Sequence, residues 1–413
     1  MTVLLAEKPD HVPAELVVDF DLFHVPAADE DVHAAYRDIQ LECPPIFWTP
    51  RHNGHWVVTR AADMEVVLRD SERFSSERIT VPRMSFEELP RMLPIELDPP
   101  AHAPYRRPLT AALLPQVVRQ LQGKVHEITR TLVDGLAPRG ECEFVRDFAQ
   151  ILPIFVFLDL VDLPRADRET LLPVADRATR NEDRDDLVKA NIEFGEYLAE
   201  YVKKRRIEPG TDLLSRIVNI EIDGRRISDE EAQSYAKLIL VGGLDTVTST
   251  LGFVARLLAL RPDLRTLIRS RLDDEAFLRK AAEELLRRNG VSTLGRTVRA
   301  DMEFNGVFFR KGDFIMNPTL LGGLDDARFP DPMEIDFDRP TPLHHTIFGA
   351  GAHNCPGAPL ARRELIAFLQ EWLFRIPDFS IRPGTRPVME TGGVNGVREL
   401  HLVWTPGEAG QRA

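Results

Sequence analysis

Cysteine is scarce in this chain of 413 residues, and long apolar runs are absent. Cys43, Cys142 and Cys355 are an odd number, too few for a disulfide scaffold. That shortage favours a reducing compartment, and we expect the cytoplasm. No run of 18 or more apolar residues predicts a membrane span, and the N-terminus lacks the basic and apolar regions of a signal peptide. No membrane association is therefore predicted.

An excess of basic charge is also missing, since the formal net charge is −13. Phosphate backbones need a basic surface, so nucleic-acid binding is not expected. Repeats, low-complexity tracts and Gly/Ser linkers do not occur. Hydrophobic residues make up 43% of the chain and charged residues 28%, which is typical of a globular protein. We predict a poorly ordered tail over residues 1–15 and a single domain over residues 16–413.

The spacing of apolar residues predicts a mainly α fold with small β-sheets. Residues 55–60 read as a strand, 61–70 as a helix and the proline-rich stretch 82–100 as a long loop. Residues 105–290 are mostly helical, and Asn305-Gly306 marks a hairpin. Helices are expected over 109–138, 187–206 and 358–376. The longest is expected from about Ser228 to Leu260, where Ser228 and Glu231 form a capping-box pattern and the apolar residues surround the helix.

The most informative segment surrounds Cys355. Residues 348–357 read Phe-Gly-Ala-Gly-Ala-His-Asn-Cys-Pro-Gly, and a helix follows at once. The glycines at 349 and 351 permit tight turns and close approach of a flat ligand. A cysteine just before a helix N-terminus is stabilised as a thiolate, and a thiolate can ligate haem iron. The alternative is a structural cysteine, the usual fate of a free one.

A second unusual segment lies in the middle of the long helix. Gly242 and Gly243 cost up to about 1 kcal/mol each in a helix interior, and Asp245 is costly to bury unpaired. A helix opened here would leave a groove for a diatomic ligand. Thr246 could then hydrogen-bond bound dioxygen, and Asp245 could connect it to solvent protons. The alternative is a glycine-based helix crossing with a capping threonine.

Together these motifs resemble the cytochrome P450 family, most closely its bacterial camphor-hydroxylase branch. The resemblance rests on the segment 348–357 and on the strings LVGGLDTV, EELLRR, CPGAPLARRE and RIPDFSI. It covers nearly the whole chain and implies the triangular-prism fold of cytochrome P450. It also implies haem b (heme b, iron protoporphyrin IX) with Cys355 as the ligand to the iron. The activity implied is a monooxygenase that inserts one oxygen of O2 into a C–H bond.

The same resemblance assigns roles to further residues. Asp245 and Thr246 would be catalytic, with Asp176 and Arg180 gating proton entry. The haem would also be contacted by the residues His102, Arg106, Arg296, Phe348 and His353. At position 294, where the branch often has an aspartate, this chain has Leu294, which puts one propionate contact in doubt. A structural triad would be formed by Glu284, Arg287 and Arg339. Taken singly, each of these charged residues reads as a solvated surface charge.

The substrate pocket and the redox partner are likewise implied. By correspondence, the substrate-binding residues would be Leu93, Leu238, Val241, Gly242, Ser292 and Val394. This small, apolar set suits a terpenoid or norisoprenoid. The chain carries no flavin or iron–sulfur domain, so electrons would come from a [2Fe–2S] ferredoxin and its reductase. A basic patch for an acidic ferredoxin would comprise Arg106, Arg107, Arg362 and Arg363.

Two other functions remain open at this stage. The first is a peroxygenase that uses hydrogen peroxide directly, although such relatives typically lack the acid–threonine pair. The second is a haem carrier or sensor without catalysis, which needs neither proton-relay groups nor a long proline-rich substrate loop. Turnover with ferredoxin compared with turnover with peroxide separates the three.

Camphor itself is expected to bind weakly. The camphor enzyme holds the ketone with a tyrosine hydroxyl, whereas residues 86–97 of this chain contain no tyrosine and Pro90 falls near that position. A spectral titration of the haem spin state should therefore show a weak or partial response to camphor. A tight, complete high-spin shift would contradict this expectation.

Overall fold

The computed structural model describes residues 5–407, apart from residues 82, 84–88, 90, 181–182 and 341–343, and describes positions 179, 180 and 184 in backbone only. The α-helices are α1 (Val32–Glu42), α2 (Ala61–Arg69), α3 (His102–Ala112), α4 (Pro115–Leu136), α5 (Ile151–Leu160), α6 (Arg168–Arg180), α7 (Arg184–Ile207), α8 (Leu213–Val218), α9 (Asp229–Leu260), α10 (Pro262–Arg269), α11 (Glu275–Arg288), α12 (Thr319–Leu324) and α13 (Ala358–Arg375). The predicted mainly α fold is confirmed.

The strands are short and form small sheets. They are β1 (Ile46–Thr49), β2 (His55–Val58), β3 (Phe74–Ser75), β4 (Glu141–Glu143), β5 (Glu221–Ile222), β6 (Arg225–Arg226), β7 (Thr293–Val298), β8 (Met302–Phe304), β9 (Val307–Phe309), β10 (Phe314–Pro318), β11 (Ser380–Ile381), β12 (Val388–Glu390), β13 (Gly396–Glu399) and β14 (His401–Val403). The largest sheet has the order β1-β2-β10-β7-β3, in which only β2 and β10 pair in parallel. Strands β8 and β9 form the predicted hairpin at Asn305-Gly306.

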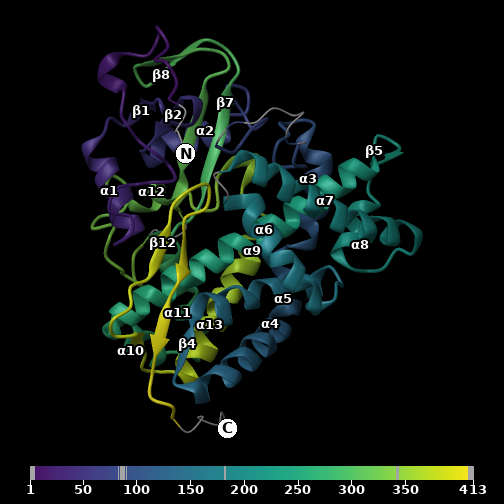
Figure 1. The fold of residues 1–413 in the computed structure, drawn as a ribbon, viewed down its shortest axis with the longest axis vertical. Helices are drawn as coiled ribbons and strands as arrows, with labels where there is room; N and C mark the ends of the chain where they lie inside the picture. The colour runs from purple at the N-terminus through teal and green to yellow at the C-terminus, as the bar shows by residue number, and fades with distance from the viewer. Residues whose placement is uncertain are drawn as a thin grey trace.

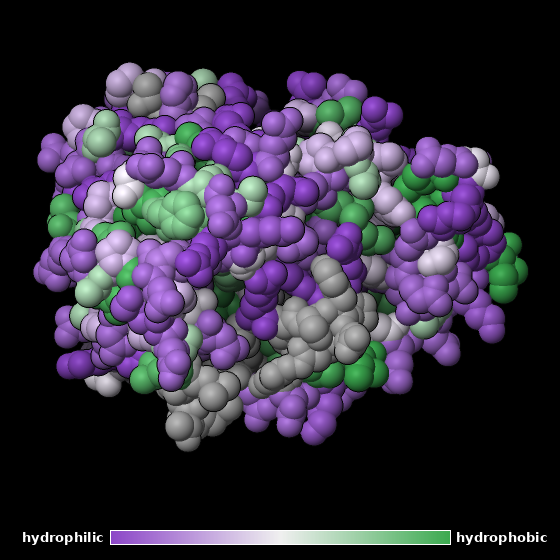
Figure 2. Space-filling view, turned by 90° about the horizontal axis from the view of Figure 1, so that it is seen from above, coloured by the Kyte–Doolittle hydropathy of each residue, from purple (hydrophilic) through white to green (hydrophobic). Residues whose placement is uncertain are grey.

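The elements separate into a sheet-rich and a helix-rich region (Figure 1). Strands β1, β2 and β7 lie with α1 and α12 on one side, and α3 to α8 lie on the other, with α9 between them. Two clusters of buried apolar side chains fill these regions, and Phe155 and Leu360 pack against both. This continuity favours the single domain expected from the sequence. The face shown in Figure 2 is mainly hydrophilic, with scattered apolar side chains.

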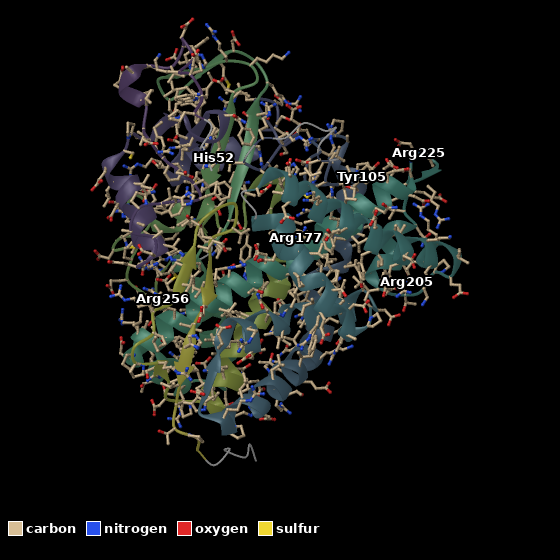
Figure 3. All side chains as sticks on the ribbon, in the orientation of Figure 1. His52, Tyr105, Arg177, Arg205, Arg225 and Arg256 are labelled. Atoms are coloured by element: carbon tan, nitrogen blue, oxygen red, sulfur yellow. The ribbon has the colours of Figure 1, made fainter. Side chains whose placement is uncertain are left out.

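Helix α9 is the central element, and its start is the one the sequence predicts. The Ser228 hydroxyl accepts a hydrogen bond from the Glu231 amide at 3.2 Å, and the Ser228 amide donates to the Glu231 carboxylate at 2.6 Å. Glu231 also accepts from Tyr105 at 2.6 Å and Arg225 at 2.7 Å, which ties α3 and β6 to α9 (Figure 3). By length and composition α9 is apolar enough to cross a membrane, but 56% of its most apolar window is buried inside the fold. A core helix has the same composition.

Helices α6 and α7 are held together by one arginine near the centre of the view in Figure 3. The Arg177 guanidinium contacts the Asp186 carboxylate at 2.5 Å and the Glu193 carboxylate at 2.8 Å. Helix α7 also packs on α9. The pair α6 and α7 therefore covers α9 as one unit, from the side on which the candidate site lies.

Two local predictions are corrected by the structure. The tail predicted over 1–15 is wrong for residues 5–15, because Val12 is buried in the core and the Ala6 amide donates to the Pro50 carbonyl at 2.8 Å. His11 also contacts the Asp313 carboxylate at 2.8 Å. The helix predicted over 109–138 is two helices, because α3 ends at Ala112 and Pro115 begins α4, where the missing amide hydrogen costs nothing.

The predicted triad of Glu284, Arg287 and Arg339 forms in the core. Glu284 and Arg287 are fully buried and meet at 2.8 Å, and Arg339 approaches Glu284 at 3.2 Å. Arg287 also donates to the carbonyls of Gly323, Pro332 and Glu334. One carboxylate therefore compensates two buried guanidinium groups, which fixes the loop 330–339 against α11.

Replacing Glu284 by Gln should destabilise the protein strongly. The substitution keeps the shape but leaves Arg287 and Arg339 without a counter-charge, which costs about 3–5 kcal/mol for a buried pair. Urea unfolding measures the free energy of unfolding. The control is Glu275→Gln on the same helix, where an exposed carboxylate contacts Arg279 at 2.8 Å and the expected loss is about 1 kcal/mol or less. Equal losses in the two variants would contradict a special role for Glu284.

Candidate active site

A cavity of about 400 Å³ lies between α9 and the segment that carries Cys355. Most of the residues predicted for the site line it, namely Arg106, Leu238, Val241, Gly242, Asp245, Thr246, Ser292, Val394, Arg296, Phe348, His353 and Cys355. The cavity is therefore bounded by the cysteine segment on one side and by the middle of α9 on the other. His102 is not in the lining but contacts the ring of His353.

Leu93 is a correction, because it does not line the cavity. Its amide donates to the Ser234 hydroxyl at 2.9 Å, and the same hydroxyl donates to the Arg91 carbonyl at 2.5 Å. These bonds hold the loop against α9, and Leu93 packs into the neighbouring apolar cluster. Met92 and Ile95 line the cavity instead. Pro90, the position compared with the camphor enzyme's tyrosine, lies outside the described residues.

Cys355 occupies the turn that leads into α13. Gly349 and Gly351 have φ of 72° and 67°, values that glycine adopts readily, and the Cys355 amide donates to the Phe348 carbonyl at 2.8 Å. Burial raises the pKa of the Cys355 thiol, whereas hydrogen bonds from the Gly357 and Ala358 amides and the charges of Arg106 and Arg362 lower it. The net effect is a raised pKa, so the donors and positive charges favour a thiolate without outweighing burial.

A second group of polar side chains lies near the cavity, and Asp98 is the acidic residue that acts on Arg296 and His102 within the described part of the chain. Arg296 is 3% exposed, burial lowers its pKa to about 10, and it donates to the Gly295 carbonyl at 2.7 Å. Burial and nearby Arg296 lower the pKa of His353 to about 3, and burial lowers that of His102 to about 4. Their ring centres lie 4.3 Å apart, and His102 Nε2 has no hydrogen-bond partner among the described residues. Such a group fits an anionic ligand that enters with its own acceptors.

These two groups together fit haem. Cys355 would hold the iron, and Arg296, His102 and His353 would hold the propionates. Arg106 lines the cavity, donates to the Asn354 carbonyl and lies close enough to Cys355 to affect its pKa. Leu294 also lines the cavity, so no carboxylate stands there to compete for Arg296.

The distal wall is made by α9 around Gly242 and Thr246. The Thr246 hydroxyl donates to the Gly242 carbonyl at 3.0 Å, and a Cβ built on Gly242 would meet no atom within 4 Å. The opened helix that we predicted is not seen, because α9 is continuous from Asp229 to Leu260. Space arises instead from the missing side chain of Gly242. The threonine hydroxyl lies at the edge of that space.

Asp245 has a charged neighbour that the sequence did not predict, Arg398. Asp176 contacts Arg398 in β13, with 2.6 Å between one oxygen and one nitrogen, and Arg398 also meets Glu390 at 3.1 Å. These carboxylates raise the pKa of Arg398, and Asp245 contributes to that rise. Arg398 therefore contacts Asp176 and also feels the charge of Asp245. Arg180 ends α6, and its side chain lies outside the described residues.

Sequence reasoning missed three cavity or near-cavity residues. Glu364 in α13 lines the cavity, and burial raises the pKa of its carboxyl to about 8. Lys237 in α9 also lines it, and burial lowers the pKa of its ammonium to about 8. Arg398 is the third. A signal for Lys237 was present, since it is the only charge between Tyr235 and Asp245.

The predicted basic docking patch is weaker than expected. Arg362 pairs with Glu283 and lies 4.7 Å from the ring centre of Phe348. Arg363 pairs with Glu275 at 3.3 Å. Both carboxylates come from α11, far away in the sequence, and they neutralise much of the charge. Of the four arginines proposed, Arg107 is the exposed one.

The cavity brings Cys355, Asp245 and Thr246 together in an arrangement that fits a haem-thiolate site. Comparison with known proteins agrees. The cytochrome P450 family model matches residues 159–397. A probable cytochrome P450 127A1 of Sinorhizobium fredii is 37% identical and covers 96% of each chain, and a steroid C26-monooxygenase of Mycobacterium tuberculosis is 31% identical, covering 92% of this chain and 95% of its own.

Solved structures show the same likeness. The crystal structure of CYP101J2 has a TM-score of 0.87 at 39% identity, and that of CYP101C1 has 0.88 at 38%; both cover 97% of this chain and 100% of their own. The chain belongs to the cytochrome P450 family. The expected fold class, the haem cofactor and the activity of a monooxygenase are thereby confirmed.

Pro356 has a testable effect on the sulfur. It follows Cys355 directly and has no amide hydrogen, so the donors to the sulfur are the later amides of Gly357 and Ala358. Fewer donors leave the sulfur more electron-rich, which lowers the reduction potential of the iron. Pro356→Leu restores an amide and should shift the potential of the holoenzyme to more positive values in a spectroelectrochemical titration.

The matched control is Pro359→Leu. Pro359 lies in the first turn of α13, and its amide position is not among the donors to the sulfur. The potential of that variant should stay at the wild-type value. The hypothesis is wrong if Pro356→Leu gives no positive shift, or if both variants shift equally.

Proposed function

We propose that this cytochrome P450 hydroxylates a compact hydrophobic substrate, a terpenoid or norisoprenoid, in the manner of the camphor-hydroxylase branch. It would use O2 and electrons from a separate [2Fe–2S] ferredoxin and its reductase, in the cytoplasm. The observation that carries the proposal is the joint placement of Asp245, Thr246 and Cys355 on one cavity. When bound there, haem supplies the iron that carries O2 and the oxidising chemistry.

The lining supports a small hydrophobic substrate. Apolar side chains are presented by Val241, Leu238, Met92, Ile95 and Val394. The volume of about 400 Å³ includes the space that the haem would take, so what remains suits a compact substrate. The names of the relatives do not decide the substrate, since they include a mycinamicin IV hydroxylase/epoxidase of Micromonospora griseorubida as well as the steroid enzyme. Support for the substrate class therefore comes from the lining of this cavity.

Proton supply would be managed by the residues of α9. The Thr246 hydroxyl donates to the Gly242 carbonyl, which leaves its oxygen lone pairs free to accept a hydrogen bond from a protonated group in the cavity. Asp245, adjacent in sequence, would exchange protons toward Arg398 and Asp176. A carboxylate next to a threonine of the cavity wall and near a charged network is suited to proton transfer.

The cysteine count supports a separate electron donor. Iron–sulfur clusters are typically held by four cysteines, and this chain has three, one of which is Cys355. An acidic ferredoxin could approach the face around Arg107 and Arg106, near the cysteine segment. The pairing of Arg362 and Arg363 with glutamates makes that attraction weaker than the sequence suggests.

The test compares electron sources and a threonine variant. Wild-type holoenzyme is supplied with terpenoids of graded size, and product is measured with ferredoxin, reductase and NADH or with hydrogen peroxide alone. Thr246→Val should keep consuming NADH while the product formed per NADH falls about tenfold or more, because proton management is lost. Thr250→Val is the control, since its hydroxyl makes the same bond one turn later, to the Thr246 carbonyl at 2.8 Å.

Each outcome has a clear meaning. Coupled turnover with ferredoxin that depends on Thr246 supports the proposal. Peroxide-driven turnover that Thr246→Val leaves unchanged would favour the peroxygenase alternative. Absence of product from any terpenoid with either source would favour a haem protein without this activity.

A further inference from the structure

Lys237 places a positive charge in the apolar part of the cavity. We propose that it binds the carboxylate of the substrate, so that the substrate is a hydrophobic carboxylic acid held at the end of the cavity away from Cys355. This inference rests on the proposed function, because it takes the cavity to be the substrate site. It narrows the substrate class from a terpenoid in general to an acid.

The position of Lys237 in α9 directs it toward the substrate region. Lys237, Val241 and Asp245 follow one another at intervals of four residues, so they share one flank of the helix, and all three line the cavity. Eight residues separate Lys237 from Asp245, which is about 12 Å along the helix axis. A substrate of moderate length can therefore reach from the ammonium to the space beside Gly242 and Thr246.

The lysine is deeply buried in the wall of the cavity. It is 9% exposed, and no described residue accepts a hydrogen bond from its ammonium or forms an ion pair with it. The Glu96 carboxylate is the opposite charge that favours the protonated form of Lys237. The Glu96 carboxylate, however, is held by Arg78 at 3.3 Å and by the Met92 amide at 2.8 Å. Because Glu96 is already paired with Arg78, it compensates the Lys237 ammonium only in part.

The positive charge of Lys237 indicates which chemical group of the substrate would bind it. Burial lowers the pKa of Lys237 to about 8, so the side chain is mostly protonated at neutral pH. A buried unpaired ammonium is costly, and an incoming carboxylate removes that cost while it forms a charge-assisted hydrogen bond. A ketone or an alcohol can accept a hydrogen bond but leaves the charge in place. A carboxylate therefore suits the site better than a neutral group of the same size.

The other cationic side chains of the cavity are used elsewhere. Arg296 and Arg106 lie toward His353 and Cys355, where they fit the haem. Lys237 lies toward the loop that carries Met92 and Glu96, outside that group. Binding of the haem therefore does not explain the presence of Lys237 in this part of the cavity.

The test measures affinity for acids and their matched alcohols. Perillic acid and perillyl alcohol share one terpenoid skeleton, and decanoic acid and 1-decanol provide a longer pair. Dissociation constants for wild-type holoenzyme, Lys237→Met and Lys237→Arg are measured by calorimetry and by the haem spin state. Lys237→Met should bind at least one acid about 10- to 100-fold more weakly, as expected for a hydrogen bond between charged groups. It should bind the alcohols equally well or better, and Lys237→Arg should retain most of the affinity for the acid.

The control is Lys280→Met, an exposed lysine on α11 with a side chain 58% exposed. It should leave all four affinities unchanged. The inference is overturned if Lys237→Met weakens binding of neither acid, or if it weakens acid and alcohol equally. Failure of the proposed function is a separate result: it shows as absent product with ferredoxin, whereas calorimetry still reports whether Lys237 selects an acid.

Discussion

A thiolate that is surrounded by protein is the constraint on which the rest of the site depends. Burial raises the pKa of the Cys355 thiol, and only groups that favour its charged form can oppose that effect. Two amides at the start of α13 and the nearby Arg106 do so. Because the amides must converge on one atom, the loop turns sharply through Gly349 and Gly351, whose φ angles are positive. The amides at the helix start and the arginine both favour the charged form of the sulfur, and the glycine-rich turn precedes them.

The opposite wall must provide space and protons without exposing its backbone. Helix α9 does this while remaining continuous, since Gly242 provides room and the Thr246 hydroxyl bonds to a carbonyl one turn earlier. An unbroken helix keeps its backbone hydrogen bonds satisfied beside an apolar cavity. Asp245, the next residue, lies where Arg398 and Asp176 link the cavity to α6 and β13. Helix α9 therefore provides space at Gly242 and a charged residue, Asp245, on one continuous helix.

Much of the fold and the site could be predicted from the sequence because local patterns encode them. The capping box, the hairpin and the segment around Cys355 each depend on neighbouring residues, and the structure contains all three. Contacts between distant segments could not be predicted. Arg362 and Arg363 were predicted to form a docking patch, but in the structure they pair with Glu283 and Glu275 of α11, which lie 79 and 88 residues away in the sequence. Leu93 was misplaced because two hydrogen bonds to Ser234 set the register of its loop.

The distribution of charge around the cavity shows how the two ligands are kept apart. Arg296 and the two histidines gather where the haem carboxylates would lie, and Lys237 lies apart from them in the proposed substrate region. Electrostatic attraction falls with distance, and each cation group therefore acts mainly on the anion nearest to it. The apolar side chains between them, such as Leu238 and Val241, offer no site for a charge. A hydrophobic acid would thus enter in one orientation, with its carboxylate distant from the iron and its hydrocarbon end beside Thr246.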